Sequence, residues 1–165
     1  MPTADPAPLG SGGSRLELKL PPPLLMLLVG FGMWALARGW PAWSLQHPLL
    51  PLIGLLLALL GAAAALTGVL AFRRAHTTVD PTRPERSSHL VSAGIYRFSR
   101  NPMYLGLALV LLSWALWLGN PLTAFGPIVF VLWMNRFQIG PEERALRRLF
   151  GEDYRRYCSQ VRRWL

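Results

Sequence analysis

Charged residues and cysteines are scarce in this chain of 165 residues, and their scarcity excludes several classes of protein. Only 15% of the residues are charged, whereas soluble domains average roughly 25%. Cys158 is the one cysteine, which excludes an internal disulfide and a paired-cysteine metal motif. The histidines, at positions 47, 76 and 89, lack the spacing of a zinc site. We therefore expect no metal centre.

Long apolar runs take the place of the missing charge, since 52% of the residues are hydrophobic. Residues 21–40 and 49–72 are each long enough to cross about 30 Å of hydrocarbon as a helix. Two further runs, 103–118 and 122–139, are separated by a Gly-Asn-Pro turn. The third run is short for a full span, so we expect its helix to begin earlier or to lie in a thinned membrane. The pattern predicts an all-α integral membrane protein with about four transmembrane helices.

The basic residues predict how these helices are oriented. In a four-helix arrangement, 16 of the 17 basic residues and all eight acidic residues fall on one side, and Arg38 alone falls on the other. Because basic residues favour the cytoplasmic side, we expect both termini in the cytoplasm. The net charge of +9 indicates contact with anionic lipid headgroups. Nucleic acid is the weaker interpretation, because no soluble basic domain is present to bind it.

Composition divides the chain into three parts. Residues 1–20 begin with a stretch rich in Pro, Gly, Ala and Ser, which predicts a disordered tail. Residues 21–72 contain the first two apolar runs, and residues 73–165 contain a polar loop, a helical hairpin and the C-terminal segment. In that last segment apolar residues recur at helical spacing among arginines. This pattern predicts an amphipathic helix on the membrane surface, bent near Gly151.

Two polar blocks flank the hairpin formed by the last two apolar runs. One contains Arg100, Asn101 and Pro102, and the other begins with Glu142 and Glu143. The hairpin can bring both blocks together on one side of a membrane, where buried polar groups are costly unless they bind something. The blocks therefore predict a ligand site. Simpler roles also fit: Asn-Pro suits a helix cap and first turn, and an acidic pair stabilises a helix N-terminus.

The two blocks together resemble the isoprenylcysteine carboxyl methyltransferase and phospholipid methyltransferase superfamily of integral membrane enzymes. The resemblance covers about 72–165. It consists of Leu90-Val91-x-x-Gly94-Ile95-Tyr96-x-x-x-Arg100-Asn101-Pro102-Met103-Tyr104-x-Gly106, an apolar hairpin, and Glu142-Glu143-x-x-Leu146-x-x-x-Phe150-Gly151-x-x-Tyr154-x-x-Tyr157-x-x-x-Val161-x-Arg163-Trp164. Many relatives have Gly-Pro-Tyr in place of Gly-Ile-Tyr. The eukaryotic prenylcysteine enzymes have His in place of Asn101, whereas bacterial relatives commonly read Arg-Asn-Pro.

This resemblance implies an enzyme that uses S-adenosylmethionine and lacks a Rossmann domain. We expect the enzyme to lie in a bacterial inner membrane. The cofactor would bind on the cytoplasmic side, between the Arg-Asn-Pro element and the C-terminal helices. The residues implied to bind it are Tyr96, Arg100, Asn101, Pro102, Tyr104, Gly106, Glu143, Tyr154 and Tyr157. The candidate catalytic residues are Glu142, Glu143, Arg100 and Arg144. An arginine would position a carboxylate or thiolate acceptor, and a glutamate would serve as the base for an amine.

The identity of the methyl acceptor stays open at this point, as does the oligomeric state. The resemblance is compatible with a lipophilic isoprenylcysteine-like acceptor, a phospholipid amine or a small thiol. A non-catalytic membrane scaffold or an anionic-lipid-binding protein also fits short apolar helices with one-sided charge. A transporter is disfavoured, because such proteins have ionisable residues inside their spans.

Overall fold

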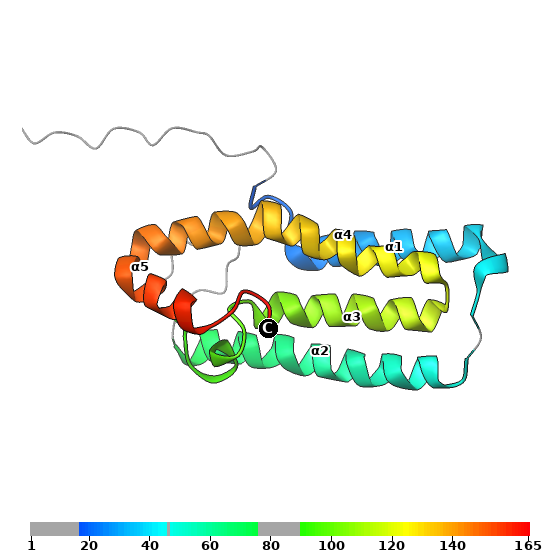
Figure 1. Cartoon of the computed structure of the whole chain (residues 1–165), viewed down its shortest axis with the longest axis horizontal. Helices are drawn as coiled ribbons and strands as arrows, with labels where there is room; N and C mark the ends of the chain where they lie inside the picture. Colours follow the sequence, from blue (N-terminus) through cyan, green and yellow to red (C-terminus); the bar gives the residue numbers. More distant parts are fainter. Residues whose placement is uncertain (1–16, 46, 76–89) are drawn as a thin grey trace, which may run out of the picture.

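The structure is a computed structural model that describes residues 17–45, 47–75 and 90–165, and within them it is helical and contains no strand (Figure 1). Residues 1–16 of the predicted disordered tail (1–20) and part of the polar loop (76–89) lie outside the described residues. The main helices are α1 (Pro22–Gly39), α2 (Leu49–Arg74), α3 (Pro102–Leu118), α4 (Phe125–Trp133) and α5 (Gly140–Gln160). Short helices join them: η1 (Pro41–Trp43), η3 (Gly94–Arg97), η4 (Pro121–Ala124) and η5 (Met134–Ile139).

Three of the described helical segments are long and apolar enough to cross a membrane: α1, α2 and the continuous stretch Pro121–Gln160. Helix α3 is apolar but has 17 residues, so the fourth predicted span stays a prediction. The long stretch is apolar only as far as η5, because α5 carries four acidic and five basic residues. The expectation that α5 lies on the membrane surface, beyond the end of the span, stays a prediction.

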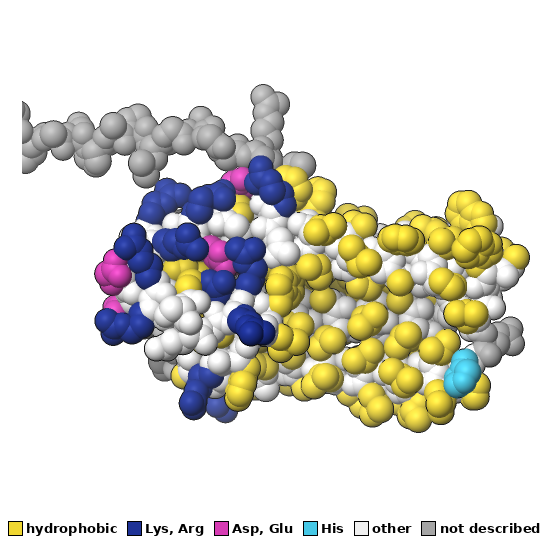
Figure 2. All heavy atoms as spheres, viewed as in Figure 1, with side chains coloured by type: hydrophobic (Ala, Val, Ile, Leu, Met, Phe, Trp, Pro, Cys, Tyr) yellow, Lys and Arg dark blue, Asp and Glu magenta, His cyan; other side chains and the backbone are white. Residues whose placement is uncertain are grey.

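Charged side chains gather at one end of the molecule, and apolar side chains cover most of the rest. Figure 2 shows lysine and arginine side chains gathered at the end that α5 covers, while hydrophobic side chains cover most of the remaining visible face. Large apolar residues such as Leu27, Phe31 and Leu56 are more than half exposed. An apolar surface of this extent requires a partner or a membrane, and the helix lengths favour the membrane. The side of the membrane that the charged end faces stays a prediction.

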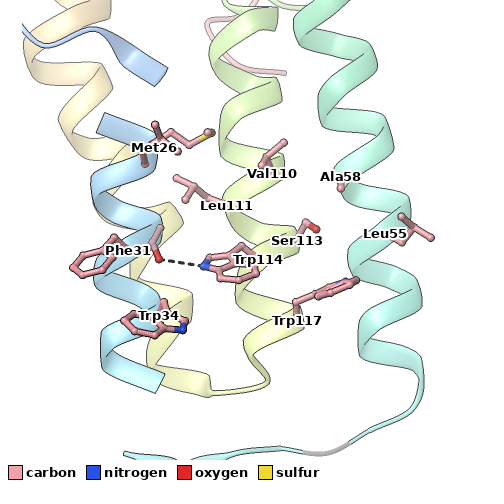
Figure 3. Close-up of a pocket in the computed structure, with 12 residues that line it drawn as sticks. Met26, Phe31, Trp34, Leu55, Ala58, Val110, Leu111, Ser113, Trp114 and Trp117 are labelled. Carbon is pink, nitrogen blue, oxygen red and sulfur yellow. Dashed lines mark hydrogen bonds between the residues drawn. The ribbon is translucent and has the colours of Figure 1, made fainter. Parts of the chain in front are cut away.

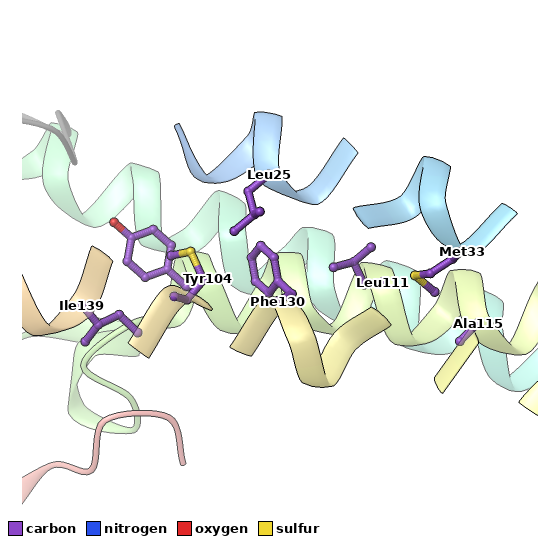
Figure 4. Packing of buried hydrophobic residues seen from close by; sticks show 8 residues of the cluster. Leu25, Met33, Tyr104, Leu111, Ala115, Phe130 and Ile139 are labelled. Carbon is purple, nitrogen blue, oxygen red and sulfur yellow. The ribbon is translucent and has the colours of Figure 1, made fainter. Parts of the chain in front are cut away.

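The main apolar core lies between α1, α3 and α4 (Figure 4). Phe130 of α4 is completely buried and lies near Leu25 of α1 and Leu111 of α3. Tyr104 belongs to the same cluster, so the start of α3 packs directly onto this core. The core therefore fixes the position of the Arg-Asn-Pro block, which immediately precedes that start.

Helices α2 and α3 contact each other backbone to backbone through a glycine pair. A Cβ atom placed on Gly106 would lie 2.4 Å from the carbonyl oxygen of Gly61, and one on Gly61 would lie 2.6 Å from that of Gly106. Small residues permit such close approach between membrane helices, where van der Waals packing drives association. Gly106 thus has a structural role at the α2–α3 crossing, which explains the glycine without a cofactor contact.

Replacing Gly106 with alanine should destabilise the bundle, because the added methyl group meets backbone that cannot move aside. We expect a loss of about 1–3 kcal/mol, the usual cost of overpacking. Thermal unfolding of the purified protein in detergent measures it. Gly32→Ala is the matched control, since a Cβ atom at Gly32 of α1 meets nothing within 4 Å. Equal melting temperatures for the two variants would contradict this packing.

Candidate functional site

The C-terminal segment returns to the beginning of α3 because α5 bends sharply at Gly151. This residue has φ 51° and ψ −120°, a left-handed backbone conformation that glycine adopts without a steric penalty. The bend predicted at this position is therefore confirmed. Beyond the bend the chain lies beside the Arg-Asn-Pro block, as Figure 1 shows at the C-terminus. The amide of Arg100 donates to the carbonyl of Arg162 at 3.0 Å.

Asn101 links the same two segments through its side chain. Its Nδ2 donates to the carbonyl oxygen of Arg163 at 2.9 Å. The side chain does not cap α3, although Asn101 occupies the N-cap position and Pro102 begins the helix as expected. The backbone N–H of Asn101 donates a hydrogen bond to the hydroxyl of Ser99 at 3.1 Å. The simple capping explanation for Asn101 is therefore wrong, whereas the one for Pro102 holds.

Glu143 is the centre of the polar cluster. It is 6% exposed, and Arg163 binds it with two hydrogen bonds, from Nε at 3.0 Å and from Nη2 at 2.7 Å. Nη2 of Arg100 lies 3.3 Å from the same carboxylate. A two-point arginine–carboxylate pair with a second guanidinium has strong and well-defined geometry. Glu143 therefore joins the Arg-Asn-Pro block to the C-terminal segment, beyond any effect on the helix dipole.

One N–H donor of Arg100 has no hydrogen-bond acceptor among the described residues. Its Nη1 donates to Sγ of Cys158 at 2.5 Å, and its Nη2 faces Glu143. Its Nε is buried and finds no hydrogen-bond acceptor among the described residues. A buried donor without an acceptor is costly and marks a place where a ligand can supply one.

Glu142 lies next to Glu143 but has different neighbours. Its Oε1 accepts hydrogen bonds from the Tyr104 hydroxyl at 2.5 Å and from Nε2 of Gln138 at 2.6 Å. Burial raises the pKa of the Glu142 carboxyl to about 7, although the two hydrogen bonds act in the opposite direction. Such a carboxyl changes its charge near neutral pH, as a general base must. The two adjacent glutamates are therefore chemically distinct.

A π-helix, η5, presents polar side chains to this site. Gln138 and Ile139 are adjacent in sequence and both are buried, as the wider turn of a π-helix permits. Oδ1 of Asn135, also in η5, accepts a hydrogen bond from Nε1 of Trp164 at 3.0 Å. Short π-helical insertions in helices occur frequently at functional sites. Here η5 connects the span α4 to the charged helix α5.

Three buried tyrosines, Tyr96, Tyr154 and Tyr157, pack together beside the cluster. The Tyr157 hydroxyl donates to the carbonyl of Tyr96 at 2.7 Å, and the rings of Tyr154 and Tyr157 lie 6.2 Å apart. The Tyr96 ring packs edge-on against Phe72 at the end of α2. Burial, more than any neighbouring charge, raises the pKa of the Tyr96 phenol far above its ordinary value. Tyr96 is therefore neutral, and it packs with Tyr154 and Tyr157 in one buried aromatic cluster.

The structure thus brings together most of the residues predicted from the sequence, with two exceptions. Gly106 lies at the crossing with α2, and Arg144 binds Glu17 at 2.7 Å on an exposed part of α5. Sequence reasoning assigned no role to Gln138, Cys158 or Arg163. Gln138, like Asn135, is an amide at the end of an apolar run, and amides in such a position could have indicated a polar site.

Comparison with known proteins gives the family. A profile of the phospholipid methyltransferase family matches residues 50–153. The chain belongs to this family. It is 29% identical to protein-S-isoprenylcysteine O-methyltransferase B of Arabidopsis thaliana over 116 residues, which are 70% of this chain and 59% of that protein. It is 30% identical to the protein-S-isoprenylcysteine O-methyltransferase of Saccharomyces cerevisiae over 123 residues, which are 73% of this chain and 50% of that protein.

The family match agrees with the resemblance inferred from the motifs, and it supports a membrane enzyme that transfers methyl groups. The chain spans only half to three fifths of the length of the two methyltransferases. A shorter relative, an uncharacterized protein of Haemophilus influenzae, is 57% identical over 63 residues, which are 38% of this chain and 100% of that protein. No solved structure matches the chain.

Removal of the central carboxylate should release the C-terminal segment from α3. In Glu143→Gln the guanidinium groups of Arg100 and Arg163, and the more distant one of Arg147, lose their buried partner, which typically costs about 3 kcal/mol or more. We expect faster hydrogen exchange in residues 161–165 and around Arg100, measured by mass spectrometry in detergent. Glu152→Gln is the control, because Glu152 is exposed and, within the described part of the chain, pairs only with Arg155. Unchanged protection in Glu143→Gln would show that the cluster does not hold this segment.

Proposed function

We propose that the protein transfers a methyl group from S-adenosylmethionine to an amphiphilic acceptor at the cytoplasmic face of the membrane. One observation carries this proposal: the buried Glu143 carboxylate, paired with Arg100 and with the partly exposed Arg163, joins the two motif blocks on the charged side of an apolar bundle. The buried Nε of Arg100, which has no acceptor among the described residues, is a donor that a bound ligand would satisfy. The family match supports the reaction class.

The side chains of the cluster suit S-adenosylmethionine chemically. The unpaired Nε of Arg100 can donate to the cofactor's carboxylate, and the Glu143 carboxylate can attract its ammonium group. The aromatic faces of Tyr96, Tyr154 and Tyr157 suit an adenine ring and a sulfonium cation. Asn101, Pro102 and Tyr104 would shape the side of the site nearest α3. Gly106 and Arg144 have no part in it.

The cofactor supplies a methyl group already activated by its positive sulfur, so the protein needs mainly to align the acceptor and exclude water. Tyr104 and Gln138 orient the Glu142 carboxyl with hydrogen bonds. This carboxyl lies at the boundary between the apolar core and the charged end. It is thus placed to meet the polar end of an acceptor that enters from the membrane.

A lateral groove offers a place for the apolar part of such an acceptor (Figure 3). It has a volume of about 550 Å³, with walls from α1 and α2 and a floor from α3. The indole N–H groups of Trp114 and Trp117 donate to the carbonyls of Gly30 and Pro51. The groove therefore presents an almost wholly apolar surface. Its floor begins near Leu111, about 10 Å along α3 from Tyr104.

The length of the acceptor's tail should therefore control catalytic efficiency. Each buried methylene contributes about 0.8 kcal/mol, so kcat/KM should rise along a homologous series until the groove is full. The transfer of a radiolabelled methyl group to acceptors of increasing chain length measures this dependence of kcat/KM on tail length. Ala58→Phe narrows the groove and should shorten the optimal tail. Ala63→Phe, on an exposed part of the same helix outside the groove, should leave the optimum unchanged. A flat profile would favour a small soluble acceptor.

An amine acceptor, as in phospholipid N-methylation, is the second candidate, and the Glu142 carboxyl favours it. With a pKa near 7 this group is protonated in acid and becomes a base as the pH rises. Methylation of an amine should therefore increase with pH as the carboxyl ionises around pH 7, and level off only once the carboxyl is fully ionised at higher pH. Glu142→Gln should lose this titration and most of the rate, about a hundredfold.

Initial rates across this pH range, with an amine and with a carboxylate acceptor of equal tail length, separate the two chemistries. A carboxylate needs no base, so its methylation should not require the ionised Glu142. If the variant keeps the full amine rate and its pH profile, Glu142 is not the base. The pH profile of the carboxylate acceptor is the control for general effects of pH on binding.

A further inference from the structure

A second polar site lies on the outer side of α5, where the first described residue of the chain meets two arginines. Oε2 of Glu17 lies 2.7 Å from Nη2 of Arg144, and its Oε1 lies 3.4 Å from Nη1 of Arg136. The Glu17 side chain is 14% exposed, whereas those of Arg136 and Arg144 are 62% and 50% exposed. One carboxylate is thus enclosed by cations that remain open to solvent and headgroups.

The segment after Glu17 is held in place by its backbone. The amide of Leu18 donates to the carbonyl of Phe137 in η5 at 3.1 Å. Leu18 has φ 57°, in the left-handed region that is unfavourable for a leucine. Contacts with η5 and α5 must therefore offset local backbone strain. A segment bound in this way can be displaced by a competing anion.

A pocket of about 480 Å³ lies beside this contact. Arg144 and Arg148 supply cations at its rim, and Leu18, Ala145 and Leu149 supply an apolar lining. Arg148 donates to the carbonyl of Arg144, and no acidic side chain pairs with it among the described residues. The pocket is larger than a phosphate ion requires, and it combines cations with apolar surface at the boundary between the apolar span and the charged helix α5.

We propose that this pocket binds the phosphate headgroup of an anionic phospholipid through Arg136, Arg144 and Arg148, in competition with the carboxylate of Glu17. The phosphate would take the position that Glu17 now occupies between the guanidinium groups. The glycerol and the first methylenes would lie against Leu149 and Ala145. An amphiphile fits this combination better than a free anion, which would leave the apolar lining without a partner. The proposal does not depend on the methyl-transfer function.

To test the site, the 165-residue protein in an uncharged detergent is titrated with short-chain phosphatidylglycerol at low salt. Calorimetry measures the binding. Removing two pocket arginines in Arg144→Gln/Arg148→Gln should weaken binding about 25-fold, at about fivefold for each cation. The matched control is Arg155→Gln/Arg156→Gln, which removes the same charge from α5 outside the pocket. This control should weaken binding less than threefold, because it removes only long-range electrostatic attraction. Equal losses in the two double variants would overturn the proposal.

Glu17→Gln supplies the independent arm, because it removes the competing carboxylate from the surface without disturbing the core. Phosphatidylglycerol should bind about fivefold more tightly to this variant, and an unchanged or weaker affinity would contradict the competition. Short-chain phosphatidylcholine should bind at least tenfold more weakly than phosphatidylglycerol. If inorganic phosphate displaces phosphatidylglycerol at equal concentration, the site recognises the ion and not the lipid, and the proposal fails.

Discussion

The contact between the Glu143 carboxylate and two arginines is the interaction on which the organisation of the charged end depends. It connects three parts of the chain: the start of α3 through Arg100, the beginning of α5 through Glu143 itself, and the C-terminal segment through Arg163. Burying these charges together is costly unless each hydrogen bond is made. The bend at Gly151, the bond from Asn101 to the Arg163 carbonyl and the packing of the tyrosines all serve to bring these groups together.

The apolar bundle and the polar cluster are complementary parts of one arrangement. The core around Phe130 and the backbone contact between Gly61 and Gly106 fix the beginning of α3. The π-helix η5 then joins the span to α5 and buries Gln138 beside Glu142. A carboxyl with a pKa near neutrality thus lies where the membrane-embedded and charged parts meet. This position suits an acceptor with a polar end and an apolar tail, the chemistry that we propose.

The sequence predicts the helical spans and the proximity of the two motif blocks, because hydrophobic run length and hairpin connectivity are local properties. It also predicts the bend at Gly151, whose residue type permits a left-handed backbone. It cannot distinguish the roles of adjacent residues. Glu142 and Glu143 look alike in sequence and differ only through their neighbours. Gly106 and Arg144 contact residues outside the site. Arg163 lies 20 residues after Glu143 and reaches it only because the chain turns back beyond Gly151, a contact that no periodic pattern reveals.

The most direct test of the central claim is hydrogen exchange with and without S-adenosylmethionine, mapped along the detergent-purified protein by mass spectrometry. If the cluster around Glu143 holds the cofactor, its addition should slow exchange in two separate stretches, 96–104 and 154–163. Exchange in α1 and in the loop that contains η1 should not change. Binding that protects neither stretch, or no binding at concentrations that saturate methyltransferases, would contradict the account.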